Sequence, residues 1–204
     1  MDNKVIGVVG ATASGKTSLA IKIAQKYDGE IISADSMQIY KGMNIATAKP
    51  DKEEMCGIPH HIMDFLTPTE TFSVSQYVEM AKSKIDEILS RGKIPIVCGG
   101  TGLYVRSLVE NIQFSPEQAD ENLRNALNER YEKEGGEVLL KEPAEFDEDI
   151  AKTLHPSNNK RIIRAIEIYK TTGVTMSEHI KKSMRKAPSR KRLLKWTVTR
   201  NLHI

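Results

Sequence analysis

Cysteine is scarce in this sequence of 204 residues, and long apolar runs are absent. Cys56 and Cys98 are its two cysteines and do not form a CxxC pair, so neither a disulfide framework nor a zinc site is indicated. No apolar stretch approaches the roughly 20 residues of a transmembrane helix. A strand pattern begins within a few residues of Met1, which leaves no room for a signal peptide. We therefore expect a cytoplasmic protein with reduced cysteines and no membrane partner.

The sequence also has no internal repeat and no low-complexity tract. Its content of 39% hydrophobic and 28% charged residues is typical of a folded globular protein. A chain of this length can bury one sizeable core and add one smaller unit. We expect one principal domain and a monomer.

The net charge of +3 is small, but the charges are segregated along the chain. Residues 117–149 are rich in Glu and Asp. The stretch from His179 to Lys195 has no acidic residue and eight lysines and arginines: Lys181, Lys182, Arg185, Lys186, Arg190, Lys191, Arg192 and Lys195. Such a run is typical of nucleic-acid contact, in which phosphates are neutralised, and equally of a solvated linker.

A glycine-rich loop follows the apolar run Val5–Val9 and opens a helical pattern. Its residues are Gly10, Ala11, Thr12, Ala13, Ser14, Gly15, Lys16 and Thr17, which match the phosphate-binding P-loop at every fixed position. The glycines let consecutive N–H groups point into one cavity, the helix adds its positive end, and Lys16 adds a full charge. The Thr17 hydroxyl is a candidate ligand for Mg²⁺. The loop indicates a diphosphate or triphosphate but not the molecule that carries it.

The rest of the first half alternates between strand and helix patterns. Further strands are expected over 30–34 and 95–98, and helices over 16–27 and 72–91. Ser73 is a plausible N-cap and Gly92 a stop for the second helix. The last strand ends in the glycine-rich turn Gly99–Gly102. These elements predict an α/β fold, a P-loop NTPase-like parallel sheet flanked by helices, with its ligand loops at the carboxyl ends of the strands.

Between about 114 and 184 the strand signal gives way to helical, charge-rich segments, including 122–134, 147–153 and 158–172. Residues 193–198 could return to the sheet as a last strand. We therefore expect a core domain formed by 1–113 and 185–204 and a helical insertion formed by 114–184.

Asp35 stands at the end of the second strand pattern, close to the first strand's loop. It could hold Mg²⁺ through water, accept a proton from a nucleophile beside the phosphates, or serve only as a cap or turn residue. Nearby Ser36 and Gln38 have the donors and acceptors to read a base edge. His60, His61 and Asp64 invite a metal interpretation, but adjacent histidines point apart, so we expect them to brace the active-site loop.

Several segments occur in the order found in one family: Ile32–Met43 (ISADSMQIYKGM), Thr47–Pro50 (TAKP), His60-His61 with Asp64, Gly99–Tyr104 (GGTGLY), His155-Pro156 and Lys160–Glu167 (KRIIRAIE). Together with the P-loop, they closely resemble the bacterial tRNA dimethylallyltransferases, also called tRNA isopentenyltransferases. The resemblance covers nearly the whole chain.

The resemblance implies transfer of a dimethylallyl group from dimethylallyl diphosphate to N6 of the adenosine next to the anticodon, at position 37 of tRNA. Lys16, the loop amides and Mg²⁺ at Thr17 would stabilise the departing pyrophosphate, with Thr12 against the same substrate. Asp35 would accept the N6 proton. The implied tRNA contacts are Asp35, Ser36, Met37, Gln38, Thr101, Arg124, Lys160, Arg161, Ile162, Ile163 and Arg164. Those from Arg124 onward lie in the insertion 114–184, which the resemblance implies to be tRNA-binding. Thr101 could instead be a helix N-cap, and the basic side chains of 160–164 a solvated helix face.

Two other functions fit parts of the pattern. A P-loop alone would favour a small-molecule kinase in which Asp35 binds an acceptor hydroxyl, and the basic segments would suit an RNA-binding protein with a vestigial P-loop. Family members continue beyond the position of Ile204, through further tRNA contacts. We expect this C-terminally shortened chain to fold and bind pyrophosphate but to modify tRNA less efficiently than a longer relative.

Overall fold

The computed structural model describes residues 4–44, 47–112, 120–185 and 195–198. These residues fall into two compact units, one within Met1–Ile112 together with Pro188–Ile204 and the other within Gln113–Ala187. We call them the α/β unit and the helical unit. The functional roles predicted for the two parts are taken up below.

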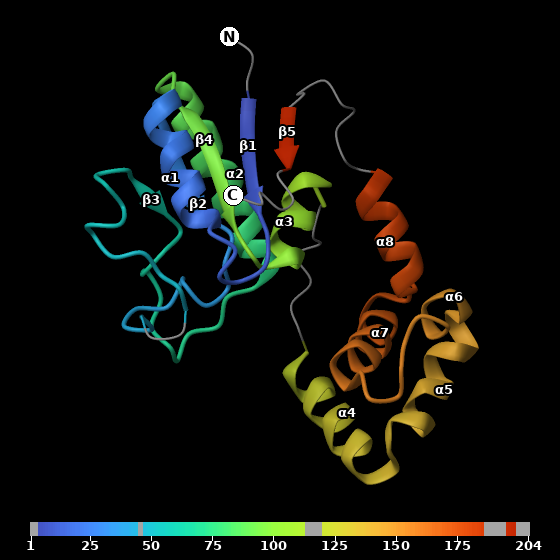
Figure 1. The fold of residues 1–204 in the computed structure, drawn as a ribbon. Helices are drawn as coiled ribbons and strands as arrows, with labels where there is room; N and C mark the ends of the chain where they lie inside the picture. Colours follow the sequence, from blue (N-terminus) through green and yellow to red (C-terminus); the bar gives the residue numbers. More distant parts are fainter. Residues whose placement is uncertain (1–3, 45–46, 113–119, 186–194, 199–204) are drawn as a thin grey trace. The chain divides into compact units, whose positions relative to one another are not determined.

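The α/β unit is built on a five-stranded parallel sheet with the order β3-β2-β4-β1-β5 (Figure 1). The strands are β1 (Lys4–Val9), β2 (Gly29–Ser33), β3 (His60–His61), β4 (Ile94–Gly99) and β5 (Lys195–Val198). The expected parallel α/β architecture is confirmed. The two-residue strand β3 was not expected, and residues 193–194 of the predicted last strand lie outside the described residues.

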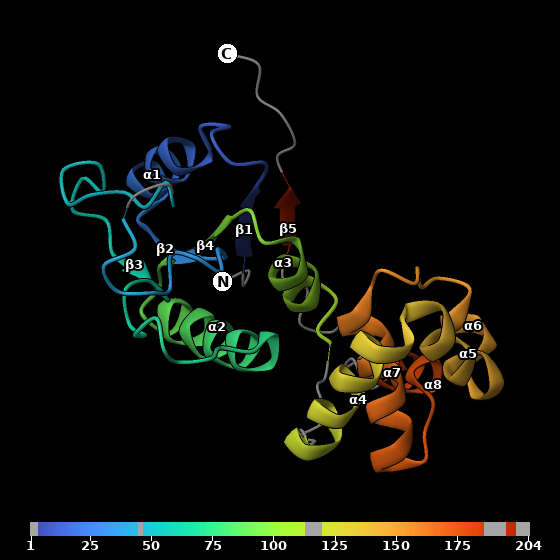
Figure 2. The same cartoon turned by 90° about the horizontal axis from the view of Figure 1, so that it is seen from below.

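Helices cover both faces of this sheet. They are α1 (Lys16–Tyr27), α2 (Val74–Ser90) and α3 (Gly102–Val109). Figure 2 shows α1 on one face and α2 on the other. Between α1 and the sheet lies a core cluster of mostly small and branched side chains, contributed by both: Val8, Ala20, Ile21, Ala24, Ile31, Ile96 and Cys98. Because both faces are buried, the strands read as continuous apolar runs, as parallel strands do.

The predicted ends of α2 are confirmed. The Ser73 hydroxyl accepts a hydrogen bond from the Gln76 backbone N–H, and the Gln76 side chain accepts one from Ser73 N–H, which together form a capping box. Gly92 follows the helix with a φ of 76°, a conformation that glycine adopts without a steric penalty. The local sequence therefore sets where this helix begins and ends.

The helical unit contains α4 (Glu121–Glu134), α5 (Gly136–Phe146), α6 (Glu148–Ala151), α7 (Asn159–Thr172) and α8 (Met176–Arg185). Its core is apolar and comes from several helices: Leu127, Leu139, Ile150, Leu154, Ile162, Ile163, Ala165 and Ile166. Gly136 is required at the start of α5, because a Cβ there would lie 1.9 Å from the Pro156 carbonyl oxygen. Across the described residues of both units, no helix is long and apolar enough to cross a membrane.

Candidate active site and nucleic-acid interface

Three loops leave the sheet at neighbouring strand ends. In the strand register, Val9 of β1 pairs with Gly99 of β4, and Ser33 of β2 pairs with Cys98 of β4. The P-loop, the Asp35 segment and the turn at Gly99–Thr101 therefore begin side by side, with the last of them in the middle. This carboxyl edge is where open parallel sheets bind their ligands.

The P-loop forms a tight turn whose residues 10–15 are exposed. Gly15 has a φ of 73° and Ala13 a φ of 61°, both in the left-handed region, so the loop curls before α1 begins at Lys16. The Lys16 ammonium donates a hydrogen bond to the Ala11 carbonyl oxygen at 2.9 Å. An ammonium has three donors, so Lys16 retains donors for phosphate oxygens. The Thr17 hydroxyl has no hydrogen-bond partner among the residues that the structure describes.

Two glycines let the β4 turn pass between the other loops. A Cβ at Gly99 would lie 2.3 Å from the backbone of Ala34, and a Cβ at Gly100 would lie 3.3 Å from the Gly10 carbonyl oxygen. The same Gly100 position is 3.9 Å from Lys16 Nζ. Glycine is therefore required at 99, where the β4 and Asp35 backbones approach each other, whereas a Cβ at 100 would make only a tight contact with the P-loop backbone.

The Asp35 carboxylate is held by the start of its own loop. Its Oδ1 accepts a hydrogen bond from Met37 N–H at 2.9 Å. Thr101 accepts one from Ser36 N–H at 2.9 Å and donates one to Ser36 Oγ at 3.3 Å. Thr101 occupies the N-cap position of α3 but makes no side-chain cap there, so its hydroxyl joins two strand-end loops. This arrangement orients Asp35 and leaves its second carboxylate oxygen without a hydrogen-bond partner among the described residues.

Gln38 does not have the free base-reading amide that its sequence position suggests. Its side-chain oxygen accepts a hydrogen bond from Ser33 Oγ at 2.9 Å, and its NH₂ donates to the carbonyl oxygens of Thr47 and Ala48 at 3.2 and 3.1 Å. The residue is 8% exposed. The amide is therefore committed within the protein, and Gln38 fastens residues 47–48 to β2.

A second brace joins the Asp35 loop to residues 64–66. Asp64 N–H donates to Gln38 O at 3.1 Å, and Lys41 N–H donates to Leu66 O at 2.8 Å. The buried Lys49 ammonium donates to Tyr40 O and pairs with the Asp64 carboxylate. These contacts support the interpretation of Asp64 as a loop brace.

The two histidines of β3 have separate structural partners. His61 Nε2 is 2.7 Å from Glu30 Oε2, and His60 Nδ1 donates to Ile58 O at 2.8 Å. Burial lowers the pKa of His60. Within the described ranges, no three His, Cys, Asp or Glu side chains gather as a metal site.

The pKa of the Cys98 thiol is affected by charges on both sides of the β4 turn. Burial raises the pKa of its thiol to about 11, an effect that the positive charge of Lys16 opposes and the negative charge of Asp35 increases. Lys16 and Asp35 are thus both within electrostatic reach of one buried atom at the end of β4. A thiol with this pKa stays protonated and unreactive at neutral pH.

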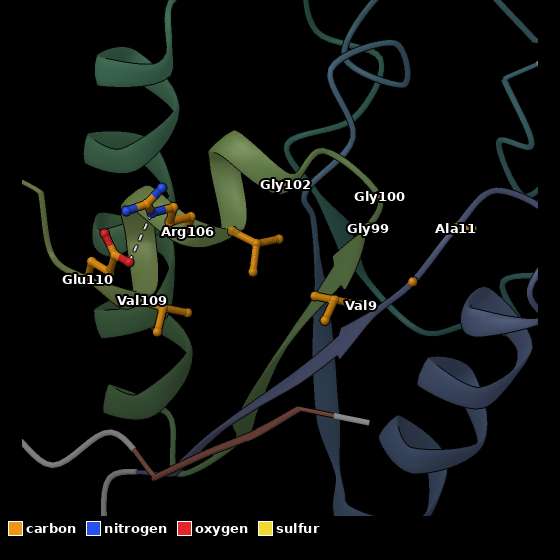
Figure 3. A pocket seen from close by; sticks show the side chains of 10 residues that line it. Val9, Ala11, Gly99, Gly100, Gly102, Arg106, Val109 and Glu110 are labelled. Carbon is orange, nitrogen blue, oxygen red and sulfur yellow. Dashed lines mark hydrogen bonds and ion pairs between the residues drawn. The ribbon is translucent and has the colours of Figure 1, made fainter. Parts of the chain in front are cut away.

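A cavity of about 450 Å³ opens beside the P-loop (Figure 3). It is lined by Val9, Gly10, Ala11, Gly99, Gly100, Gly102, Val105, Arg106, Val109 and Glu110. Figure 3 shows α3 on one side of it and the end of β1 on the other, with Arg106 paired to Glu110 at 3.0 Å. The sequence analysis did not identify the α3 residues, whose only signal was one apolar helix face after a glycine turn.

The basic segment 160–164, predicted to contact tRNA, contains both exposed and buried side chains. Lys160 and Arg161 are exposed at the start of α7 and have no side-chain ion pair with any described residue. Ile162 and Ile163 are 0% and 4% exposed and belong to the core of the helical unit, so their side chains are not available to RNA. The helical period turns these two side chains inward, and the contact of the segment with tRNA stays a prediction.

Arg124 and Arg164, the remaining predicted tRNA contacts, meet at one carboxylate. Arg124 Nη2 donates to both Glu167 oxygens at 2.8 and 2.9 Å, and Arg164 Nη1 donates to Oε2 at 2.9 Å. The contacts of Glu167 with the two arginines were not predicted from the sequence. Its signal was an acidic residue on the otherwise apolar inner face of α7.

A parallel sheet with a P-loop after its first strand places this chain in the P-loop NTPase-like fold class. Within that class, residues 38–203 match the model of the IPP transferase family. The chain belongs to the IPP transferase family.

Named relatives agree with this membership. The tRNA dimethylallyltransferase of Acetivibrio thermocellus is 52% identical over 188 residues, which are 92% of this chain and 60% of the relative. That of Bacillus subtilis is 46% identical over 181 residues, 89% of this chain and 58% of the relative. The chain thus spans about 60% of the length of the curated relatives that it matches.

Solved structures give the same result. A eukaryotic dimethylallyltransferase acting on tRNA aligns with a TM-score of 0.74 and 32% identity, over 97% of this chain and 48% of that one. The tRNA isopentenylpyrophosphate transferase of Bacillus halodurans aligns with a TM-score of 0.56 and 42% identity, over 84% of this chain and 56% of that one.

Proposed function

We propose that the chain carries the catalytic centre of a tRNA dimethylallyltransferase, which transfers a dimethylallyl group from dimethylallyl diphosphate to N6 of adenosine 37 and releases pyrophosphate. The observation that carries the proposal is the placement of a P-loop and the Asp35 carboxylate at strand ends separated only by β4. The names of the relatives favour this reaction over a small-molecule kinase. We propose that the protein works in the cytoplasm as a monomer.

The diphosphate would bind to the P-loop. The backbone N–H groups of the exposed residues 10–15 and the positive end of α1 suit an anion, and Lys16 adds charge where the leaving group gains it. When the allylic C–O bond breaks, its electron pair moves to the diphosphate, and these groups stabilise the product. The apolar side chains of Val9, Val105 and Val109 line the same cavity and would suit the hydrocarbon part of the substrate.

The proposed site also fits Mg²⁺. This ion commonly takes one or two protein oxygens and completes its shell with phosphate oxygens and water, and the uncommitted Thr17 hydroxyl offers one such oxygen. Bound Mg²⁺ would supply further neutralisation of the diphosphate. We assign Asp35 to the proton rather than to the metal.

Asp35 would accept the proton that N6 loses as its lone pair attacks the allylic carbon. The hydrogen bond from Met37 N–H fixes Oδ1 and orients the carboxylate, so Oδ2 is the acceptor that we propose. The adenine must leave the anticodon-loop stack to reach this site, which costs less in a single-stranded loop than in a duplex. Ser36, Met37 and Thr101 surround Asp35 and are the proposed contacts to the base.

The decisive experiment offers the purified chain labelled dimethylallyl diphosphate with unmodified tRNA, and separately ATP with a pool of small-molecule acceptors. Labelled tRNA that loses its label when Asp35 is changed to Asn supports the proposed reaction. Phosphorylation of a metabolite without tRNA labelling would support the kinase alternative instead. RNA binding without either reaction would favour an RNA-binding protein with a vestigial P-loop.

A further inference from the structure

A buried carboxylate connects two arginines in the helical unit. Glu167 lies on α7 and is 1% exposed, while the side chains of Arg124 on α4 and Arg164 on α7 are 42% and 38% exposed. The two arginines donate hydrogen bonds to the carboxylate at 2.8 to 2.9 Å. A buried carboxylate is tolerated only when it is paired and hydrogen-bonded in this way. The charged ends of both arginines are consequently held at one point near the surface.

A second arginine cluster of the same unit has a different arrangement. Two arginines share one carboxylate at Glu167. Arg130, further along α4, is instead held by two carboxylates, Glu134 and Glu142. Lys170 Nζ also lies 3.7 Å from Glu142, so this second cluster joins two cations to two carboxylates.

The Glu167 cluster also keeps hydrogen-bond donors. Arg124 uses one terminal nitrogen, Nη2, for both of its bonds to Glu167. Its Nε and Nη1 groups have no partner among the described residues. Exposed Lys160 and Arg161 precede Arg164 by one helical turn, so they extend the same positive surface.

We propose that Glu167 is a positioning residue that holds Arg124 and Arg164 as a pair for one backbone phosphate of the RNA substrate. This inference rests on the proposed function of the chain. A guanidinium binds phosphate oxygens well because its donors form a planar fork, and holding two forks in place reduces the entropy lost on binding. Stability alone is a weak reason for such a residue, since apolar replacements of buried ion pairs are often neutral or stabilising.

Simple charge counting and positioning make opposite predictions for Glu167→Gln. Removing a negative charge beside RNA should tighten binding if the carboxylate acts only through its field. If Glu167 positions the two arginines, the same change releases them, and RNA binding should weaken. The sign of the effect is therefore a readout that a purely electrostatic role would not give.

The experiment measures binding of an unmodified anticodon stem-loop RNA to the 204-residue chain by fluorescence anisotropy at several salt concentrations. Glu142→Gln is the matched control, because it also removes a carboxylate from an Arg–Glu cluster of the helical unit. We expect Glu167→Gln to weaken binding about tenfold and Glu142→Gln to leave it unchanged or slightly tighter, with pyrophosphate binding by calorimetry unaffected in both. Equal or tighter RNA binding by Glu167→Gln would overturn the positioning role.

A second variant covers loss of folding in the first. Arg124→Lys keeps the charge and the Arg164–Glu167 pair but removes the fork, so it should also weaken RNA binding several-fold, and adding Glu167→Gln should have a less than additive effect. Full additivity would contradict the pair. If the unchanged chain binds no RNA at any salt concentration, the proposed function and this inference both fail. If the unchanged chain binds RNA and neither substitution weakens that binding, only this inference fails.

Discussion

The α/β unit and the helical unit hold their polar groups by different means. In the α/β unit, the candidate groups stand on loops at adjacent strand ends, and glycines such as Gly99 and Gly100 permit the backbones to approach. In the helical unit, the candidate groups are long side chains on packed helices, and Arg124 and Glu167 are 43 residues apart in the sequence. The first arrangement follows from local sequence motifs, whereas the second depends on how α4 and α7 pack.

This difference predicts how substitutions should behave. Changes at the strand ends alter the position or charge of groups that would touch the reacting atoms, so they should affect the chemical step strongly. Changes on the helices would alter one of several proposed phosphate contacts, so they should affect RNA affinity and its salt dependence moderately. The following predictions test that division, beginning with the largest effect.

Lys16→Ala should lower catalytic efficiency by about 10³ and weaken pyrophosphate binding, because the P-loop loses its only full charge at the leaving group. Calorimetry with pyrophosphate and prenylation kinetics with tRNA measure the two effects. Lys22→Ala is the control, since Lys22 is an exposed residue of the same helix outside the loop. Unchanged pyrophosphate affinity in Lys16→Ala would mean that the P-loop is not the phosphate site.

Asp35→Asn should slow the chemical step by about 10² or more while tRNA binding changes little. The amide preserves the shape and can still accept from Met37 N–H, but it cannot take the N6 proton. Single-turnover prenylation with saturating tRNA measures this step directly. A near-normal rate would remove Asp35 from the mechanism, and a loss confined to tRNA affinity would move it to substrate recognition.

Gln38→Leu should slow prenylation about tenfold and destabilise the chain by about 1–3 kcal/mol, because it leaves the buried Ser33 Oγ and the carbonyl oxygens of Thr47 and Ala48 without their partner. Thermal unfolding without RNA measures the second effect. Gln25→Leu, at an exposed position of α1, is the control. Normal stability combined with altered base preference would instead support the original interpretation of Gln38 as a base-reading residue.

The elements predicted from sequence are those with a strong local signal. The P-loop has fixed glycines, and α2 carries both its apolar face and its capping residues, so its ends could be predicted. The strand β3 could not, because two histidines give no apolar alternation. Residues 136–146 were not predicted as a helix because Gly135, Gly136 and Pro143 are typical of breaks, yet packing against Pro156 favours the glycine at 136.

The candidate site follows the same rule. Lys16, Thr17 and Asp35 could be proposed from sequence because each follows a recognisable strand. The hydrogen bonds of the Gln38 amide could not be predicted, because Thr47 and Ala48 accept them through backbone carbonyls, which every residue type has. The pairing of Arg124 with Glu167 depends on packing between α4 and α7, which a single sequence does not specify.

The smallest predicted effect tests whether a long-range ion cluster in the α/β unit affects stability alone. Glu30 is buried and contacts His61 and Arg91, with Lys93 nearby. Burial by itself would raise the pKa of Glu30, but the His61 hydrogen bond and the positive charges of Arg91, His61 and Lys93 outweigh it, so the pKa lies below its usual value. The folded state thus favours the ionised carboxylate, which stabilises the protein above the unfolded-state pKa.

That stabilisation is lost as the pH falls below the unfolded-state pKa and through the lowered folded-state pKa, so Glu30→Gln should flatten a plot of Tm against pH below about pH 5. Prenylation at pH 7 should change by less than about twofold, because Glu30 lies near the start of β2 and the candidate site lies beyond its end at Ser33. Glu79→Gln, at an exposed position of α2, is the control. An activity loss larger than the stability change explains would show that side-chain clusters also govern the chemistry of the α/β unit, and the division between the two units would not hold.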